Sequence, residues 1–169
     1  DDAEVKRVSE AATNPIRKLP YSTPAYTVSD GVTLLETPEG PMPIEVFGAH
    51  NLNNLAGAKW ICQNMGVDEA DFYEAIASFK GASKRLEKIA EGKGRVAYKD
   101  FAHSPSKVAA TTKAVKEQYP NRTLVACLEL HTYSSLNAEF LKEYEGALEY
   151  ADEAVVFYSP DAVKIKQLE

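Results

Sequence analysis

The residue types best suited to chemistry lie in a short polar stretch, Asp100 to His103, where a carboxylate and an imidazole are close together. An apolar run over 94–98 leads into this stretch, and Ser104 and Pro105 follow as the expected N-cap and first residue of a helix. A strand, a polar loop and a helix start, in this order, form a ligand-binding edge at the carboxyl end of a sheet. The free N–H groups of the helix start suit an anion. We therefore expect a small-molecule site around this loop.

Three polar residues outside this loop are candidates for the same site. Asn51 and Asn54 are three positions apart in a segment with helical spacing, so they share one face, and their carboxamides could pair with the edge of a heterocycle. The simpler interpretation is that both asparagines cap the helix. Arg85 closely precedes the strand that ends at Asp100, although Lys84 and Arg85 would ordinarily be a solvated pair. A guanidinium stays charged and can pair with two phosphate oxygens.

The motifs disfavour several other kinds of site. Three histidines, each in a loop after a strand, raise the alternative of a zinc site: His50, His103 and His131. They share no compact motif such as His-Glu-x-x-His, so we expect no metal centre. The chain has no Gly-x-Ser-x-Gly elbow and no Gly-x-Gly-x-x-Gly or Gly-x-x-x-x-Gly-Lys-[Ser/Thr] sequence. It therefore lacks a phosphate-binding loop of its own.

The composition is that of a globular protein. Hydrophobic residues make up 44% of the 169 positions and charged residues 26%, which allows a packed core. The net charge of −6 argues against nucleic acid or a membrane surface as the main partner. Cys62 and Cys127 lie in segments that we expect to be buried, which fits a reducing cytoplasm. The chain opens Asp-Asp-Ala-Glu without a methionine or signal peptide, so we expect a piece of a longer protein.

Hydrophobic spacing predicts two halves. In the first half we expect a short helix, a three-stranded meander and two further helices, over 3–12, 25–28, 32–35, 43–47, about 51–65 and 68–79. The last of these helices carries an apolar stripe: Phe72, Ala75, Ile76 and Phe79. In the second half strands and helices alternate, over 95–101, 105–118, 123–130, 137–150 and 153–158, with another helix beginning at Pro160. Such alternation predicts a parallel sheet, with the loops after Phe101 and Leu130 on the same edge.

Three motifs occur in an order and spacing typical of one protein family. They are Gly48-x-His50-Asn51-x-x-Asn54, Phe79-Lys80-Gly81-Ala82-x-x-Arg85-Leu86-Glu87 and Asp100-Phe101-Ala102-His103-x-Pro105. Together they resemble the Mur ligase family, the ATP-dependent amide ligases of peptidoglycan synthesis. The Ala-x-x-Arg-Leu-Glu and Asp-Phe-Ala-His stretches are most similar to the murein peptide ligase subfamily, which joins a salvaged tripeptide to UDP-N-acetylmuramate. The UDP-N-acetylmuramate–L-alanine ligases are the alternative.

The resemblance implies a three-domain enzyme of which this chain holds the C-terminal part, without the UDP-substrate domain and the central P-loop. Residues 1–79 would be the C-terminal remnant of the central ATP-binding domain, 80–85 a hinge, and 86–169 an incomplete C-terminal domain. The implied fold class is α/β: a Rossmann-like C-terminal Mur ligase domain with a mainly parallel sheet, preceded by a β-meander and helices left from the ATPase domain.

The resemblance also implies roles for individual residues. Asn51 and Asn54 would contact the adenine side of ATP, and Arg85 would reach the phosphates as the catalytic residue when the C-terminal domain closes. Asp100 would accept hydrogen bonds from the ribose hydroxyls, with His103 beside it. His50 would only shape its loop. The loop after the second strand would contact the incoming peptide through His131, Tyr133, Ser134 and Ser135.

The implied reaction joins an amino acid or murein peptide to UDP-N-acetylmuramate through an acyl phosphate, in the bacterial cytoplasm. It would use ATP and Mg²⁺, the metal being held mainly by the missing central domain, and would involve neither nucleic acid nor a membrane. Without a P-loop the fragment alone would be inactive. A non-catalytic α/β module that binds a small molecule is the remaining alternative.

Overall fold

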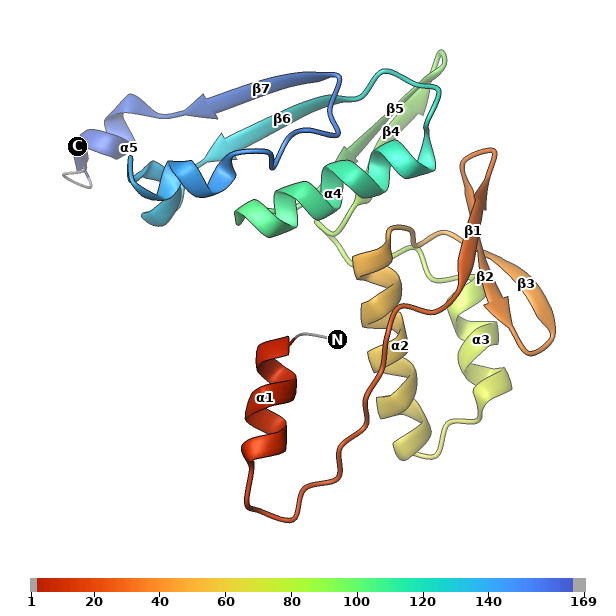
Figure 1. The fold of residues 1–169 in the computed structure, drawn as a ribbon. Helices are drawn as coiled ribbons and strands as arrows, with labels where there is room; N and C mark the ends of the chain where they lie inside the picture. The colour runs from red at the N-terminus through yellow and green to blue at the C-terminus, as the bar shows by residue number, and fades with distance from the viewer. Residues whose placement is uncertain (1–2, 166–169) are drawn as a thin grey trace.

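The computed structural model describes residues 3–165, which form two groups of elements (Figure 1). The first group comprises α1 (Ala3–Ala11), β1 (Tyr26–Ser29), β2 (Val32–Thr37), β3 (Gly40–Ile44), α2 (Ala49–Asn64) and α3 (Glu69–Ala77). The second comprises β4 (Glu87–Gly92), β5 (Arg95–Lys99), α4 (Pro105–Gln118), β6 (Val125–Leu130), the short 3₁₀ helices η1 (Ser134–Leu136) and η2 (Phe140–Tyr144), β7 (Glu153–Tyr158) and α5 (Pro160–Ile165). The opening Asp1-Asp2 and residues 166–169, into which the predicted last helix would extend, lie outside the described range.

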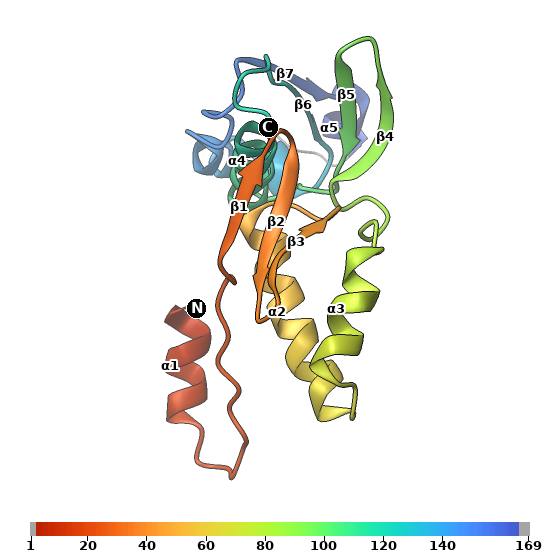
Figure 2. The ribbon, with the colours of Figure 1, turned by 90° about the vertical axis from the view of Figure 1, so that its right-hand side faces the viewer.

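The predicted meander is confirmed, with all three strands antiparallel in the order β1-β2-β3. Asp30 (φ 52°) and Gly31 (φ 78°) both adopt left-handed backbone between β1 and β2, which is the turn that matches the twist of a tight hairpin. The third strand begins at Gly40, three residues earlier than predicted. The meander lies against α2 and α3 (Figure 2) around a buried apolar cluster: Leu35, Ile44, Leu52, Leu55 and Phe72.

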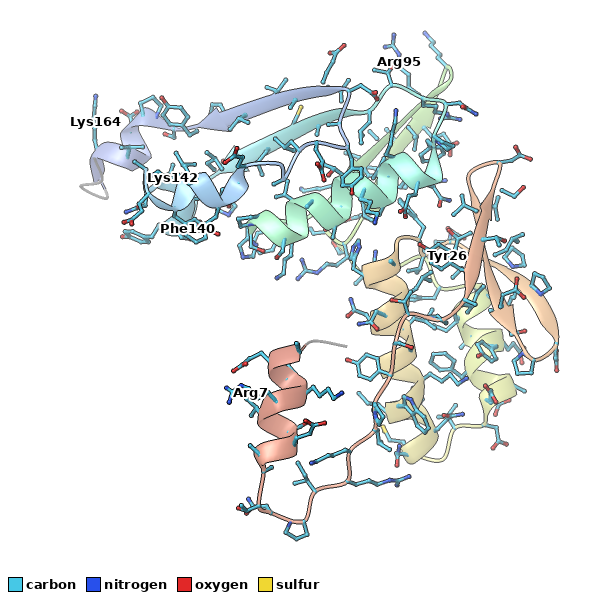
Figure 3. All side chains as sticks on the ribbon, viewed as in Figure 1. Arg7, Tyr26, Arg95, Phe140, Lys142 and Lys164 are labelled. Atoms are coloured by element: carbon cyan, nitrogen blue, oxygen red, sulfur yellow. The ribbon has the colours of Figure 1, made fainter. Side chains whose placement is uncertain are left out.

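The helices of the first group begin and end close to the predicted residues. Gly48 precedes α2 with φ 86°, and Gly66, with φ 91°, follows its end. The helix α1 buries none of its residues, and its side chains project into solvent, with Arg7 paired to Glu4 (Figure 3). Within residues 3–165, none of the helices combines the length and apolar character that a bilayer crossing requires.

The second group confirms the predicted fold class. Its strands β6 and β7 pair in parallel, as the alternating pattern predicted, and α4 and η1 supply apolar cover. The sequence did not predict β4, which pairs antiparallel with β5. Most β4 side chains are exposed, so its sequence shows no apolar alternation. Lys93 (φ 50°) and Gly94 (φ 74°) form the turn, and Arg95 follows at the tip of this hairpin (Figure 3).

The helix predicted over 137–150 is wrong. This segment contains η2 and a series of turns instead. Glu145 leaves the helical region (φ −56°, ψ 127°) and Gly146 has φ 76°, so no continuous α-helix can pass through them. At the start of the segment, the Asn137 carboxamide oxygen accepts the N–H groups of Glu139 and Phe140, which favours a turn.

The strand β6 is covered on one face only, although a continuous apolar run such as 123–130 is typical of a strand covered on both faces. Leu128 and Leu130 are buried in the cluster with α4, whereas Val125 is 52% exposed. Cys127 is also exposed and not buried as predicted, while Cys62 is partly buried. The alternation follows because successive side chains of a strand point to opposite faces, and the described elements pack against one of them.

The two groups also contact each other directly. Phe47, Leu86 and Ala114 form a third buried cluster that includes residues from both groups. The Thr33 hydroxyl donates to the Gln118 carboxamide oxygen at 3.0 Å, and the Gln118 amide donates to the carbonyl of Gly31. These contacts place the C-terminal half of α4 against the β1–β2 hairpin.

Candidate functional site

A cavity of about 340 Å³ lies where the start of α2 meets the end of α3 and the segment 80–85 that follows. Asn51, Asn54 and Arg85 all line it. Its remaining walls are largely apolar and include Phe79, which is 46% exposed. Phe79 therefore borders the cavity, whereas the apolar stripe of a helix is ordinarily buried in the core. The structure brings together three of the predicted site residues from two distant segments.

The two asparagines differ in their local bonding. Asn51 lies in the first turn of α2 and its side-chain amide donates to the carbonyl of Phe47 at 3.0 Å. Gly48 is the N-cap and no side chain caps the helix, so neither asparagine is a capping residue. In the described part of the chain Asn54 makes no hydrogen bond through its exposed side chain. The Asn54 carboxamide is thus available to a ligand as donor and acceptor.

Arg85 lies on a tight turn between two residues with left-handed backbone, Lys84 (φ 56°) and Leu86 (φ 48°). Leu86 is buried in the cluster between the two groups, whereas Arg85 is exposed. The guanidinium carbon lies 5.8 Å from the centre of the Phe101 ring, within the range of a cation–π interaction. The turn thus directs one permanent positive charge to a surface shared by the cavity and the Phe101 loop.

The Asp100 carboxylate accepts hydrogen bonds from within the chain. One oxygen accepts the N–H of Phe101 at 2.8 Å and that of Leu86 at 3.4 Å, and the other accepts the Thr111 hydroxyl of α4. Asp100 lines a second cavity, of about 370 Å³, between β5, α4 and β6. It therefore does not share the cavity of Arg85 and the two asparagines, although Leu86 borders both cavities.

The loops after β5 and β6 lie close together, as predicted, although β5 belongs to the sheet of β4 and not, as expected, to the parallel sheet of β6 and β7. The ring centres of His103 and His131 are 6.5 Å apart, and the Phe101 ring lies 4.9 Å from the first and 6.1 Å from the second. One His103 ring nitrogen lies 2.9 Å from the Phe101 carbonyl oxygen. Together with Arg85, these rings form a continuous aromatic and basic surface. Sequence reasoning did not single out Phe101, although it lies inside the third motif.

Burial lowers the pKa of His50, and the opposing charge of Asp100 only partly offsets this effect. Burial favours the neutral imidazole because the charged form loses its hydration.

Among the residues that the structure describes, no group of three His, Cys, Asp or Glu side chains could hold a metal ion. The three histidines do not form the zinc site that their loop positions suggested as an alternative.

The loop proposed for the incoming peptide offers some of its predicted residues. Tyr133 is 67% exposed and Ser134 is also exposed, but Ser135 is only 1% exposed. The Ser135 hydroxyl exchanges hydrogen bonds with Thr132, whose N–H and hydroxyl both lie within 3.0 Å of it. Ser135 therefore stabilises the loop, and the exposed side chains are those of His131, Tyr133 and Ser134.

No family model matches the chain, but individual proteins do. A UDP-N-acetylmuramate–L-alanine ligase of Lactococcus lactis subsp. cremoris strain MG1363 is 32% identical over 113 residues, which is 67% of this chain and 25% of the relative. The same-named enzyme of Caldicellulosiruptor bescii is 34% identical over 113 residues, covering 67% of this chain and 24% of the relative. The chain thus spans about a quarter of the length of these relatives.

The structural neighbours have the same fold. The crystal structure of UDP-N-acetylmuramate–alanine ligase from Thermotoga maritima matches with a TM-score of 0.66 at 22% identity, over 90% of this chain and 35% of that one. The MurF protein of Acinetobacter baumannii matches with a TM-score of 0.55 at 17% identity, over 84% and 37%. These relatives support the Mur ligase family. Both sequence relatives are L-alanine ligases, whereas the motifs favour the murein peptide ligases within the Mur family.

Proposed function

We propose that this chain is part of an ATP-dependent ligase that joins an amino acid or a murein peptide to UDP-N-acetylmuramate. The observation that carries the proposal is the cavity in which Asn51, Asn54 and Arg85 meet. Amides that can pair with a heterocycle and a guanidinium that can pair with phosphate are what a nucleotide requires. In this proposal residues 1–79 are the end of an ATP-binding domain, 80–85 a hinge, and 86–169 a C-terminal domain.

In the proposed reaction, a carboxylate oxygen of UDP-N-acetylmuramate attacks the γ-phosphorus of ATP. The bond from that phosphorus to the ADP oxygen breaks, which gives an acyl phosphate and ADP. The amine of the second substrate then attacks the acyl carbon, loses a proton, and phosphate leaves. This chain contributes Arg85, whose charge offsets negative charge on the phosphoryl oxygens in both steps.

The described residues of this chain include no cluster of three His, Cys, Asp or Glu side chains that could hold Mg²⁺ on their own. We therefore place its ligands in the rest of the enzyme, as the absence of a P-loop also indicates.

The proposed ribose contact of Asp100 would have to use the oxygen that also accepts the Thr111 hydroxyl, because the other oxygen accepts two N–H groups. His103 is partly buried, with its ring centre 4.9 Å from that of Phe101.

The test is Arg85→Ala in the full-length enzyme, with the adjacent Lys84→Ala as matched control. We expect loss of Arg85 to lower kcat about 10²- to 10³-fold, as for other groups that stabilise transition-state charge, with the melting temperature unchanged. Lys84→Ala should retain activity, because the Lys84 side chain lines neither cavity. An Arg85→Ala enzyme as fast as wild type would remove Arg85 from the mechanism.

The second substrate distinguishes two versions of this proposal. The Ala-x-x-Arg-Leu-Glu and Asp-Phe-Ala-His stretches support a murein tripeptide, while the activity of the sequence relatives supports L-alanine. Release of phosphate by the full-length enzyme with UDP-N-acetylmuramate and each amine in turn decides between them. A free-standing binding module is the alternative from another class, and micromolar binding of ATP to residues 1–169 alone, measured by calorimetry, would favour it.

A further inference from the structure

The backbone that carries Arg85 is unusual on both sides of the arginine. Lys84 and Leu86 have φ values of 56° and 48°, in the left-handed region that residues with a β-carbon rarely occupy. Single residues in this region persist where neighbouring groups hold them there. The sequence contains glycine at 81 but none at 84 or 86, so the conformation comes from contacts and not from glycine.

Two carboxylates bind the N–H groups of these two residues. An oxygen of Glu87 accepts the Lys84 N–H at 2.8 Å and the Ser83 hydroxyl at 3.1 Å. An oxygen of Asp100 accepts the Leu86 N–H at 3.4 Å. The N–H of Lys84 and the Ser83 hydroxyl also hold the pKa of Glu87 below its usual value, so the carboxylate stays charged near neutral pH.

The base of the turn is closed by the loop that follows β5. The Phe101 N–H donates to the Lys84 carbonyl at 3.0 Å as well as to Asp100. The Asp100 carboxylate is in turn oriented by the hydroxyl of Thr111 on α4. The turn is therefore tied to both β4 and α4, and Arg85, its central residue, is left exposed beside the cavity of Asn51.

We propose that Glu87 and Asp100 are positioning residues that hold the Lys84–Leu86 turn in its left-handed form, so that the Arg85 guanidinium reaches the nucleotide phosphates. This inference rests on the proposed function and adds to it a cause for the position of the arginine. Glu87 is the sharper test, because the proposed function gives it no contact with the nucleotide.

The experiment compares Glu87→Ala and Glu87→Gln in the full-length ligase, with Glu91→Ala as control. Glu91 lies on the same hairpin and pairs with Lys88, away from the turn. We expect Glu87→Ala to lower kcat about tenfold to hundredfold, because a misplaced charge stabilises the transition state poorly. Glu87→Gln should retain most of the activity, since its carbonyl oxygen can still accept the Lys84 N–H. Glu91→Ala should behave as wild type.

A double variant separates positioning from general stability. If Glu87 acts through Arg85, then Glu87→Ala should add no further loss to Arg85→Ala. Losses that multiply in the double variant, or a Glu87→Ala enzyme with normal kcat, would overturn the inference while Arg85→Ala remains slow. An Arg85→Ala enzyme of normal speed would instead remove the proposed function of Arg85, so the two failures are distinguishable.

A second route tests the same turn if Glu87→Ala does not fold. Thr111→Val keeps the side-chain shape and removes the hydroxyl that orients Asp100. We expect a lower kcat, with no further loss in combination with Arg85→Ala. An unchanged kcat would overturn the part of the inference that concerns Asp100.

Discussion

The contact between Gln118 and the β1–β2 hairpin makes a quantitative prediction about stability. Gln118 is 5% exposed and Thr33 0%, and the Gln118 carboxamide bonds both the Thr33 hydroxyl and the Gly31 carbonyl. Gln118→Leu would remove this partner from the buried Thr33 hydroxyl and from the half-buried Gly31 carbonyl. Each buried polar group left unsatisfied costs about 1–3 kcal/mol, so we expect the free energy of unfolding to fall by about 2–4 kcal/mol.

Urea unfolding of residues 1–169, followed by circular dichroism and by fluorescence of Trp60, measures this change. With a denaturant slope of about 2 kcal/mol per molar, the midpoint should fall by about 1–2 M. Lys113→Ala is the matched control on the same helix, because it removes an exposed pair with Glu117 and a cation–π contact with the Tyr150 ring at 5.9 Å, which together are worth about 1 kcal/mol or less. If the urea midpoint of Gln118→Leu equals that of Lys113→Ala, the reasoning that this contact stabilises the fold is refuted.

Two further predictions concern Gly48 and His50. Gly48 has φ 86°, and a β-carbon there would lie 2.5 Å from that of Ala114, so Gly48→Ala should lower the free energy of unfolding in urea by about 2–5 kcal/mol. Gly66 has φ 91° but open space around it, so Gly66→Ala should lower the free energy of unfolding by only about 1–2 kcal/mol. Equal losses would contradict the close approach of α2 and α4. The pKa of His50 is lower in the folded chain than in the unfolded chain, so the stability due to its neutral form is fully present above about pH 6.5 and is lost as pH falls. His50→Gln should reduce the dependence of the urea midpoint on pH between about 4 and 7, and an unchanged dependence would show that His50 does not contribute.

The sequence was a good guide where local chemistry decides the structure. The Asp30-Gly31 pair predicted the first hairpin turn because both residues tolerate left-handed backbone. Gly48 and Gly66 marked the ends of α2, and Pro105 marked the start of α4, for similarly local reasons. The parallel pair of β6 and β7 followed from apolar runs separated by a long connection.

The errors arose where contacts distant in sequence decide the outcome. The segment 137–150 has helical spacing, yet the Asn137 side chain and the left-handed Gly146 interrupt it. The polar strand β4 exists because β5 supplies its hydrogen bonds, and nothing in its own residues indicates this. For the same reason Phe79 borders a cavity and not the core.

The site divides in the same way. Residue types and spacing alone indicated that Asn51, Asn54, Arg85 and Asp100 have ligand chemistry, because amides, guanidinium and carboxylate are recognisable without coordinates. Only the tertiary structure decided that the first three share a cavity while Asp100 faces another one and holds backbone N–H groups. The physical reason is that a side chain's chemistry belongs to its atoms, whereas its partners are set by how helices, strands and turns pack together.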